Sequence, residues 1–119
     1  MKLHCDIHLP AIKSESNRAL MIAAYGGFDA DFQNLSDSND TLILANALHE
    51  IEQNNSVIDI ADCGTAARFL TTYLVCREGE WLLTGTERMK QRPIKPLVDA
   101  LRSLGANIRY AENEGFLPL

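Results

Sequence analysis

The sequence predicts an α/β fold built from repeated βαβαβ units. Short hydrophobic segments typical of strands alternate along the chain with longer apolar runs of helical spacing. The two halves also match at an offset of 50 residues, because Arg18 and Arg68 stand in the first expected helix of each half, and Ile58 and Ile108 in the closing strands. A simpler explanation is that any α/β protein shows such coarse alternation. The repeat-like units cover about 11–60 and 61–119.

The first half begins with a period-two hydrophobic pattern over residues 3–9, which predicts a half-buried strand. A turn then leads to a helix, for which Ser14 and Ser16 are capping candidates and which two adjacent glycines end. The near-continuous apolarity of this helix implies that it is buried on most sides. The elements expected next are a strand over 28–35, a helix capped within 37–40 and running through Leu48, and a strand over 57–60.

The second half repeats this order. Its first helix should begin at a strand-to-helix turn where Thr65 is the capping candidate. Right-handed crossovers would link the strands. The expected elements are a helix over 65–75, a strand over 81–84, a helix over 96–104 and a strand over 107–110.

Composition narrows the class of protein. A chain of 119 residues can bury one modest core, and its 46% hydrophobic residues are too many for a disordered segment. A net charge of −5 disfavours nucleic acid and anionic membranes as partners. The three cysteines lack a C-x-x-C spacing, which argues against a disulfide framework or a zinc site and favours a cytoplasmic location. The sequence also lacks the apolar block of a signal peptide and any stretch long enough to span a membrane.

The first cluster of candidate binding residues lies where a loop becomes a helix. Lys13, Ser14 and Arg18 can converge there on a phosphate or carboxylate, because the first amides of a helix are unpaired and its dipole is positive at that end. In the structural alternative Ser14 is a cap, Lys13 is solvated, and the side chain of Arg18 lies along the helix with its charged end in solvent.

The second cluster lies at the next strand-to-helix junction, over residues 62–68. Gly64 permits close approach of a ligand to the backbone. The segment is not a Walker A loop, because the second glycine and the Lys-Ser/Thr pair are absent. The alternative is a plain turn in which Arg68 pairs with a carboxylate such as Asp62.

The third cluster is a basic loop over residues 84–96, which holds four cationic residues and one anionic residue in an acidic protein. Arg92 is its strongest candidate, because Pro93 stiffens the adjacent backbone and a guanidinium can grip a carboxylate or phosphate through two hydrogen bonds. A solvated loop or a nucleic-acid patch are the alternatives. With 7% aromatic residues, stacking platforms for nucleic acid are scarce.

These clusters resemble, in order, the EPSP synthase (3-phosphoshikimate 1-carboxyvinyltransferase) family. Ile12 departs from that pattern where serine is usual, and Asp62 and Cys63 stand where asparagine and a small residue are common. The matching segments are residues 9–20 (L-P-x-S-K-S-x-S-N-R-A-L), 34–40 (N-x-x-x-S-x-D), 64–68 (G-T-x-x-R) and 84–94 (T-G-x-x-R-M-x-x-R-P-I).

The resemblance implies α/β units of an inside-out type, with helices inside and sheet towards solvent, in a partial N-terminal lobe covering residues 1–119. It implies a reaction in which the 5-hydroxyl of shikimate 3-phosphate attacks C2 of phosphoenolpyruvate while C3 is protonated, after which phosphate leaves. No metal or organic cofactor is implied. The chain would be part of a longer protein, with its remaining partner the C-terminal part of the same chain. We expect it to bind substrate without turnover.

The site residues follow from the resemblance position by position. Lys13 would contact both substrates, Ser14 and Arg18 would hold shikimate 3-phosphate, and Gly64 and Arg92 would lie against phosphoenolpyruvate. Arg68 would orient neighbours or lie at a domain interface, and no catalytic proton-transfer residue is expected within this chain. The alternative functions are a UDP-N-acetylglucosamine enolpyruvyl transferase and a stand-alone anion-binding module. Uncovered helix faces would favour self-association.

Overall fold

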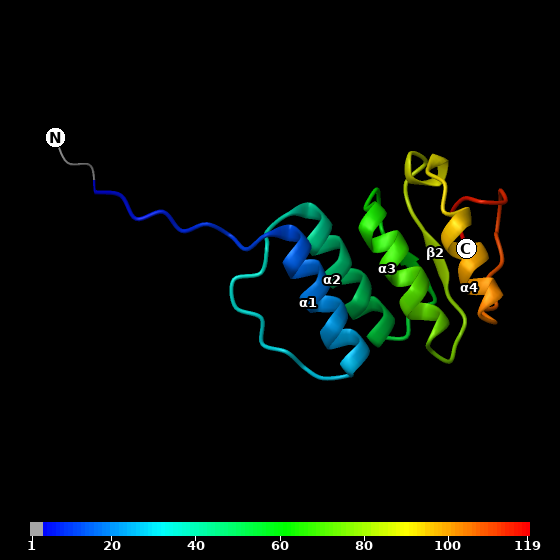
Figure 1. The fold of residues 1–119 in the computed structure, drawn as a ribbon, viewed down its shortest axis with the longest axis horizontal. Coiled ribbons are helices and arrows are strands. Elements are labelled where there is room, and N and C mark those ends of the chain that lie inside the picture. Colours follow the sequence, from blue (N-terminus) through cyan, green and yellow to red (C-terminus); the bar gives the residue numbers. More distant parts are fainter. Residues whose placement is uncertain (1–3) are drawn as a thin grey trace.

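The computed structural model describes residues 4–119, and over these residues it is a small α/β structure. In Figure 1 the four α-helices begin at the same end of the molecule, and the loop after the first helix returns along the outside to that end. The predicted α/β class is therefore confirmed. The elements are α1 (Lys13–Gly26), α2 (Asn39–Glu52), β1 (Val57–Asp59), α3 (Gly64–Val75), β2 (Leu82–Thr84), the 3-10 helix η1 (Met89–Gln91) and α4 (Lys95–Ser103).

The two strands form a parallel pair in which Ile58 lies opposite Leu83. These two side chains are buried in the same hydrophobic cluster as residues of the helices. Val57 and Leu82 point to the other face and are exposed, as the period-two alternation of strands requires. Helices thus pack on one face of the sheet, while Val57 and Leu82 on the other face are exposed.

The hydrophobic core lies between α2, α3 and the sheet. Its fully buried side chains include Leu44 and Ile51 of α2, Leu70 of α3 and Val98 of α4. Each such side chain stabilises the fold by about 1.5–3 kcal/mol relative to exposure. In Figure 1 α1 lies at one side of the molecule and α4 at the other, and α1 packs on α2. None of the helices in this part of the chain is long and apolar enough to cross a membrane.

Two of the predicted helix boundaries are confirmed. Gly27 ends α1 in the left-handed conformation, with φ 63°, which glycine adopts without steric cost. Ser38 is the N-cap of α2, and its hydroxyl accepts a 3.4 Å hydrogen bond from the amide of Thr41.

The N-cap predictions for α1 and α3 were wrong. Ile12 precedes α1 without a side-chain cap, Ser14 lies within the first turn, and the buried Ser16 hydroxyl accepts a 2.9 Å hydrogen bond from the amide of Ser36 instead. At α3 the N-cap is Cys63, whose Sγ accepts from Ala66 N at 3.4 Å, and not Thr65.

Two of the predicted strands, over residues 28–35 and 107–110, are not formed. Asn34 has φ 58°, which a strand does not tolerate. The carbonyl of Ile108 accepts from the Arg102 side chain at 2.6 and 2.9 Å, and the place beside β2 is taken by Leu119, which exchanges two hydrogen bonds with Leu83. Each half therefore has two α-helices and one strand, and the repeat units over 11–60 and 61–119 stay a prediction.

The strand predicted over residues 3–9 is not formed at residues 4–9, so this prediction was wrong there. Leu3 lies outside the described residues. This segment is exposed and extends away from the body as an arm (Figure 1). A strand needs a partner for its backbone groups, and the arm pairs with no strand in the described part of the chain.

Candidate functional site

The starts of three helices gather at one edge of the molecule. Lys13 at the start of α1 contacts Asp40 in the first turn of α2, and the Asp40 carbonyl lies 3.9 Å from Sγ of Cys63, the N-cap of α3. The first intrahelical bonds are Ser16 N to Ile12 O and Ala67 N to Cys63 O. The amides before them have no intrahelical main-chain acceptor. Those of Thr41 and Ala66 donate to the side chains of their N-caps, and the others present donors and positive helix dipoles to an anion.

Lys13 reaches across from α1 to α2. Its Nζ donates a 2.8 Å hydrogen bond to Oδ2 of Asp40. This bond, together with the attraction of the carboxylate, raises the pKa of Lys13 above its ordinary value. The predicted ligand-binding ammonium is therefore fully charged at neutral pH and already anchored on one side.

Ser14 and Arg18 occupy a different face of α1. Both are exposed, and they lie in line with the exposed Ile22 and Tyr25 along one stripe of the helix, because these positions follow the helical spacing of three to four residues. Lys13, by contrast, lies on the side that faces α2. The structure thus places the predicted shikimate-phosphate residues on an exposed stripe of α1, and the ring of Tyr25 in this stripe packs edge-to-face on Tyr73 of α3 with 5.1 Å between the ring centroids.

Gly64 and Arg92 are brought into direct contact. The guanidinium of Arg92 lies over Gly64, where an added Cβ would stand 2.6 Å from Nη1 and 2.8 Å from Cζ. Real side chains do not approach so closely, so only glycine allows this arrangement without a shift of Arg92. The pairing places a planar cation beside the first amide of α3, a combination suited to a carboxylate or phosphate.

The basic loop is fixed onto the start of α3 by its backbone. Thr86 N donates a 2.9 Å hydrogen bond to Ala61 O, and Gly85 packs so closely on that carbonyl that a Cβ would collide with it. Met89 and Ile94 of the loop are buried in the core. These contacts explain why Arg92 reaches Gly64 from a segment far away in sequence.

Half of the loop's positive charge is neutralised locally. Lys90 pairs with Glu87 and Glu112, and Lys95 pairs with Asp99 and Glu114. The two arginines of the loop, Arg88 and Arg92, are exposed. Net positive charge is therefore concentrated on the arginines, one of which covers Gly64.

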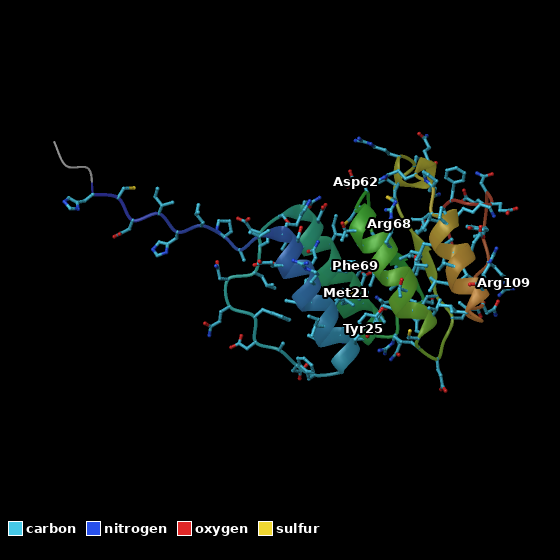
Figure 2. All side chains as sticks on the ribbon, in the orientation of Figure 1. Met21, Tyr25, Asp62, Arg68, Phe69 and Arg109 are labelled. Carbon is cyan, nitrogen blue, oxygen red and sulfur yellow. The ribbon has the colours of Figure 1, made fainter. Side chains whose placement is uncertain are left out.

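Arg68 turns back along its own helix. Its Nη1 donates a 3.0 Å hydrogen bond to the carbonyl of Gly64, and it does not form the ion pair with Asp62 that the plain-turn alternative required. Figure 2 shows Asp62 at the start of α3 and Arg68 further along the same helix. Gly64 is therefore flanked by two guanidinium groups, one at its carbonyl and one over its Cα. Burial raises the pKa of the neighbouring Cys63 thiol.

Sequence reasoning treated Asp40 as a capping residue and as part of the family-like segment 34–40, and did not foresee its contact with Lys13. It also missed a buried polar network behind the site. Asn17 Oδ1 accepts a 2.8 Å hydrogen bond from Thr41 Oγ1, which in turn lies 2.9 Å from Ser38 Oγ. Asn17 is 2% exposed. The only available signal was the polarity of Ser16 and Asn17 in a helix face that is otherwise apolar.

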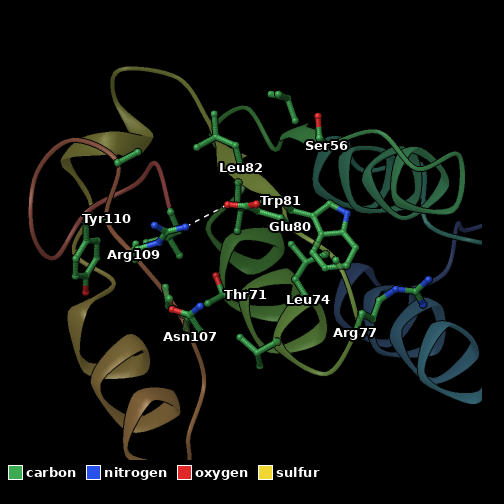
Figure 3. Close-up of a pocket in the computed structure, with 17 residues that line it drawn as sticks. Ser56, Thr71, Leu74, Arg77, Glu80, Trp81, Leu82, Asn107, Arg109 and Tyr110 are labelled. Atoms are coloured by element: carbon green, nitrogen blue, oxygen red, sulfur yellow. Dashed lines mark hydrogen bonds and ion pairs between the residues drawn. The ribbon is translucent and has the colours of Figure 1, made fainter.

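A separate groove of about 860 Å³ lies between the second half of α3, β2 and residues 107–111. Trp81 and Leu74 line it, and an ion pair of 3.2 Å joins Arg109 to Glu80 beside it (Figure 3). None of the five predicted site residues lines this groove.

Comparison with known proteins adds independent evidence. Residues 30–119 match the sequence model of the EPSP synthase (3-phosphoshikimate 1-carboxyvinyltransferase) family. The chain is 54% identical over 118 residues to a 3-phosphoshikimate 1-carboxyvinyltransferase of Bacteroides fragilis, with 99% of this chain and 28% of the relative covered. It is 44% identical over 139 residues to the protein of that name from Haemophilus influenzae, with 95% and 32% covered. The chain thus spans about a third of the length of these relatives.

Proposed function

The chain belongs to the EPSP synthase (3-phosphoshikimate 1-carboxyvinyltransferase) family, and we propose that it forms part of the substrate-binding surface of such an enzyme. The reaction is transfer of the carboxyvinyl group of phosphoenolpyruvate to the 5-hydroxyl of shikimate 3-phosphate. The hydroxyl oxygen bonds to C2 while C3 gains a proton. Loss of phosphate from C2 and of a proton from C3 then restores the double bond. We place this activity in the cytoplasm.

The contact between Arg92 and Gly64 is the observation that carries the proposal. It joins the second and third basic clusters into one half-site, with a guanidinium and the first amide of α3 side by side. Phosphoenolpyruvate offers a carboxylate and a phosphate, both of which accept two hydrogen bonds from such donors. Ser14 and Arg18, at the exposed start of α1, form the second half-site, for shikimate 3-phosphate.

Electrostatics explains why two half-sites need so many donors. Two unit negative charges 5 Å apart repel by about 3 kcal/mol at an effective dielectric constant of about 20. A hydrogen bond to a charged group contributes about 1.5–3 kcal/mol. Several cationic or amide contacts are therefore needed to hold two multiply charged substrates together. Lys13 pairs with Asp40 of α2, whose carbonyl lies 3.9 Å from Sγ of Cys63 beside the α3 half-site.

Titration of the ¹⁵N-labelled chain with each substrate tests the proposal. Shikimate 3-phosphate should shift the signals of Ser14 and Arg18, and phosphoenolpyruvate those of Gly64 and the Arg92 side chain. Inorganic sulfate serves as a charge control, and UDP-N-acetylglucosamine tests the related transferase. Absence of shifts at these residues with either substrate at millimolar concentration would contradict the proposal. Equal shifts with sulfate would reduce the site to a general anion-binding surface.

A further inference from the structure

Asp40 stands between Lys13 and the start of α3. Its carboxylate accepts the 2.8 Å hydrogen bond from Lys13 Nζ, and its main-chain oxygen lies 3.9 Å from Sγ of Cys63, the residue before Gly64. The flexible side chain of Lys13 therefore reaches from α1 to the first turn of α2, which in turn contacts the start of α3. An ammonium has three donors, so this contact leaves two of them for ligands.

Asp40 is itself held in place by the buried polar network. The hydroxyl of Thr41, the next residue, donates to Asn17 Oδ1 at 2.8 Å and lies 2.9 Å from the hydroxyl of the N-cap, Ser38. Asn17 belongs to α1, the helix that carries Lys13. The first turn of α2 is thus fixed against the first turns of α1, which sets the position of the Asp40 carboxylate.

We propose that Asp40 is a positioning residue, which holds the ammonium of Lys13 between the half-site on α1 and the half-site formed by Gly64 and Arg92. This inference rests on the proposed function. The ion pair is partly exposed, with side-chain exposures of 49% and 31%, so its contribution to stability is small. Its effect lies in the geometry of Lys13.

Charge and positioning predict opposite results when the Asp40 carboxylate is removed. A negative group beside an anion site repels the ligand, so its removal would strengthen binding if Asp40 acted through charge alone. If Asp40 positions Lys13, its removal weakens binding. Asp37 supplies a matched control, because it is an exposed carboxylate just before the same helix and its neutralisation makes the same change in net charge.

The experiment compares Asp40→Asn, Asp37→Asn and the unaltered chain. Without ligand, the Lys13 ammonium signal in ¹⁵N NMR reports whether that group is ordered. With shikimate 3-phosphate, the shift titration gives the affinity. We expect the ordered ammonium signal to be lost only in Asp40→Asn, with affinity lower by roughly threefold to tenfold, the contribution of about one hydrogen bond. Asp40→Glu, which keeps the charge, should recover part of the affinity.

Two failures can be told apart. If the unaltered chain binds shikimate 3-phosphate and the Asp40→Asn variant binds it equally well or more tightly, the positioning role of Asp40 is overturned. The proposal of two half-sites is then unaffected. The same holds if the ammonium signal of Asp40→Asn is unchanged. If the unaltered chain shows no shifts at the half-site residues, the proposed function fails, and the positioning role fails with it.

Discussion

The guanidinium of Arg92 covers the Cα of Gly64, so the residue that opens α3 and a residue of the basic loop form a single surface. Neither element alone would be a site. The loop provides the cation, the helix start provides the amide, and the backbone bond from Thr86 to Ala61 holds one against the other.

Gly64→Ala should weaken phosphoenolpyruvate binding with little effect on stability. The new Cβ would stand 2.6 Å from Arg92 Nη1, and because the arginine is exposed it can move aside instead of unfolding the helix. Alanine also favours the helix by up to about 1 kcal/mol over glycine. Urea unfolding should therefore show an equal or slightly raised free energy of unfolding, while phosphoenolpyruvate titration shows a lower affinity. Unchanged affinity would mean that Arg92 is not part of the site.

Arg92→Ala and Arg88→Ala form a matched pair in the same loop. Both remove one exposed positive charge, but only Arg92 lies over Gly64. We expect Arg92→Ala to lower the affinity for phosphoenolpyruvate by roughly tenfold or more, since a charge-assisted hydrogen bond contributes about 1.5–3 kcal/mol. Arg88→Ala should have a small effect that disappears with added salt. Equal losses in both variants would show that net charge, and not the Gly64 contact, controls binding.

Asn17→Ala should destabilise the chain by about 1–3 kcal/mol, because it removes the acceptor of a buried hydrogen bond from Thr41. Asn46→Ala provides the control, since Asn46 is exposed and bonds only to the nearby Glu50 at 3.3 Å. Chemical denaturation of both variants measures the difference. A loss below about 0.5 kcal/mol for Asn17→Ala, the range of ordinary surface substitutions, would show that the network adds little.

Cys63 should resist alkylation in the folded chain, whereas Cys5 and Cys76 react. Cys63 is buried and burial raises the pKa of its thiol, while the other two cysteines are exposed. Because its pKa is raised, the Cys63 thiol keeps its proton to higher pH in the folded state than in the unfolded state. The thiol's contribution to stability is therefore fully present below the unfolded pKa near 9 and is lost as pH rises above that value. Mass spectrometry after iodoacetamide treatment at pH 8 should find two modified cysteines, and three only after denaturation. Rapid modification of all three in the native chain would contradict the buried position.

The chain should self-associate through the exposed face of α1. Ile22 and Tyr25 are 66% and 51% exposed on this face, and burying such side chains removes apolar surface from water. Ile22→Lys should shift sedimentation towards monomer at high concentration. Leu104→Lys is the control, because Leu104 is 85% exposed but lies after α4, away from this face. A compact monomer at high concentration for the unaltered chain would contradict the prediction.

Local chemistry made much of the fold predictable. The helices were anticipated because apolar residues recur at helical spacing, and their ends at Gly27 and Ser38 follow from backbone freedom and capping. Predictions failed where a partner was required. The pattern over residues 3–9 is that of a strand, yet residues 4–9 find no strand to pair with, and the segment at 107–110 loses its carbonyl acceptor to the Arg102 side chain.

The site divides in the same way. By itself, the sequence determined which residues are cationic, that they stand at helix starts and in a proline-stiffened loop, and which family their order matches. Only the tertiary structure decided that Arg92 lies over Gly64, that Asp40 pairs with Lys13, and that Ser14 and Arg18 are exposed. The reason is physical: spacing along a helix sets the face on which a side chain lies, whereas contacts between distant segments depend on how the core brings their helices and loops together.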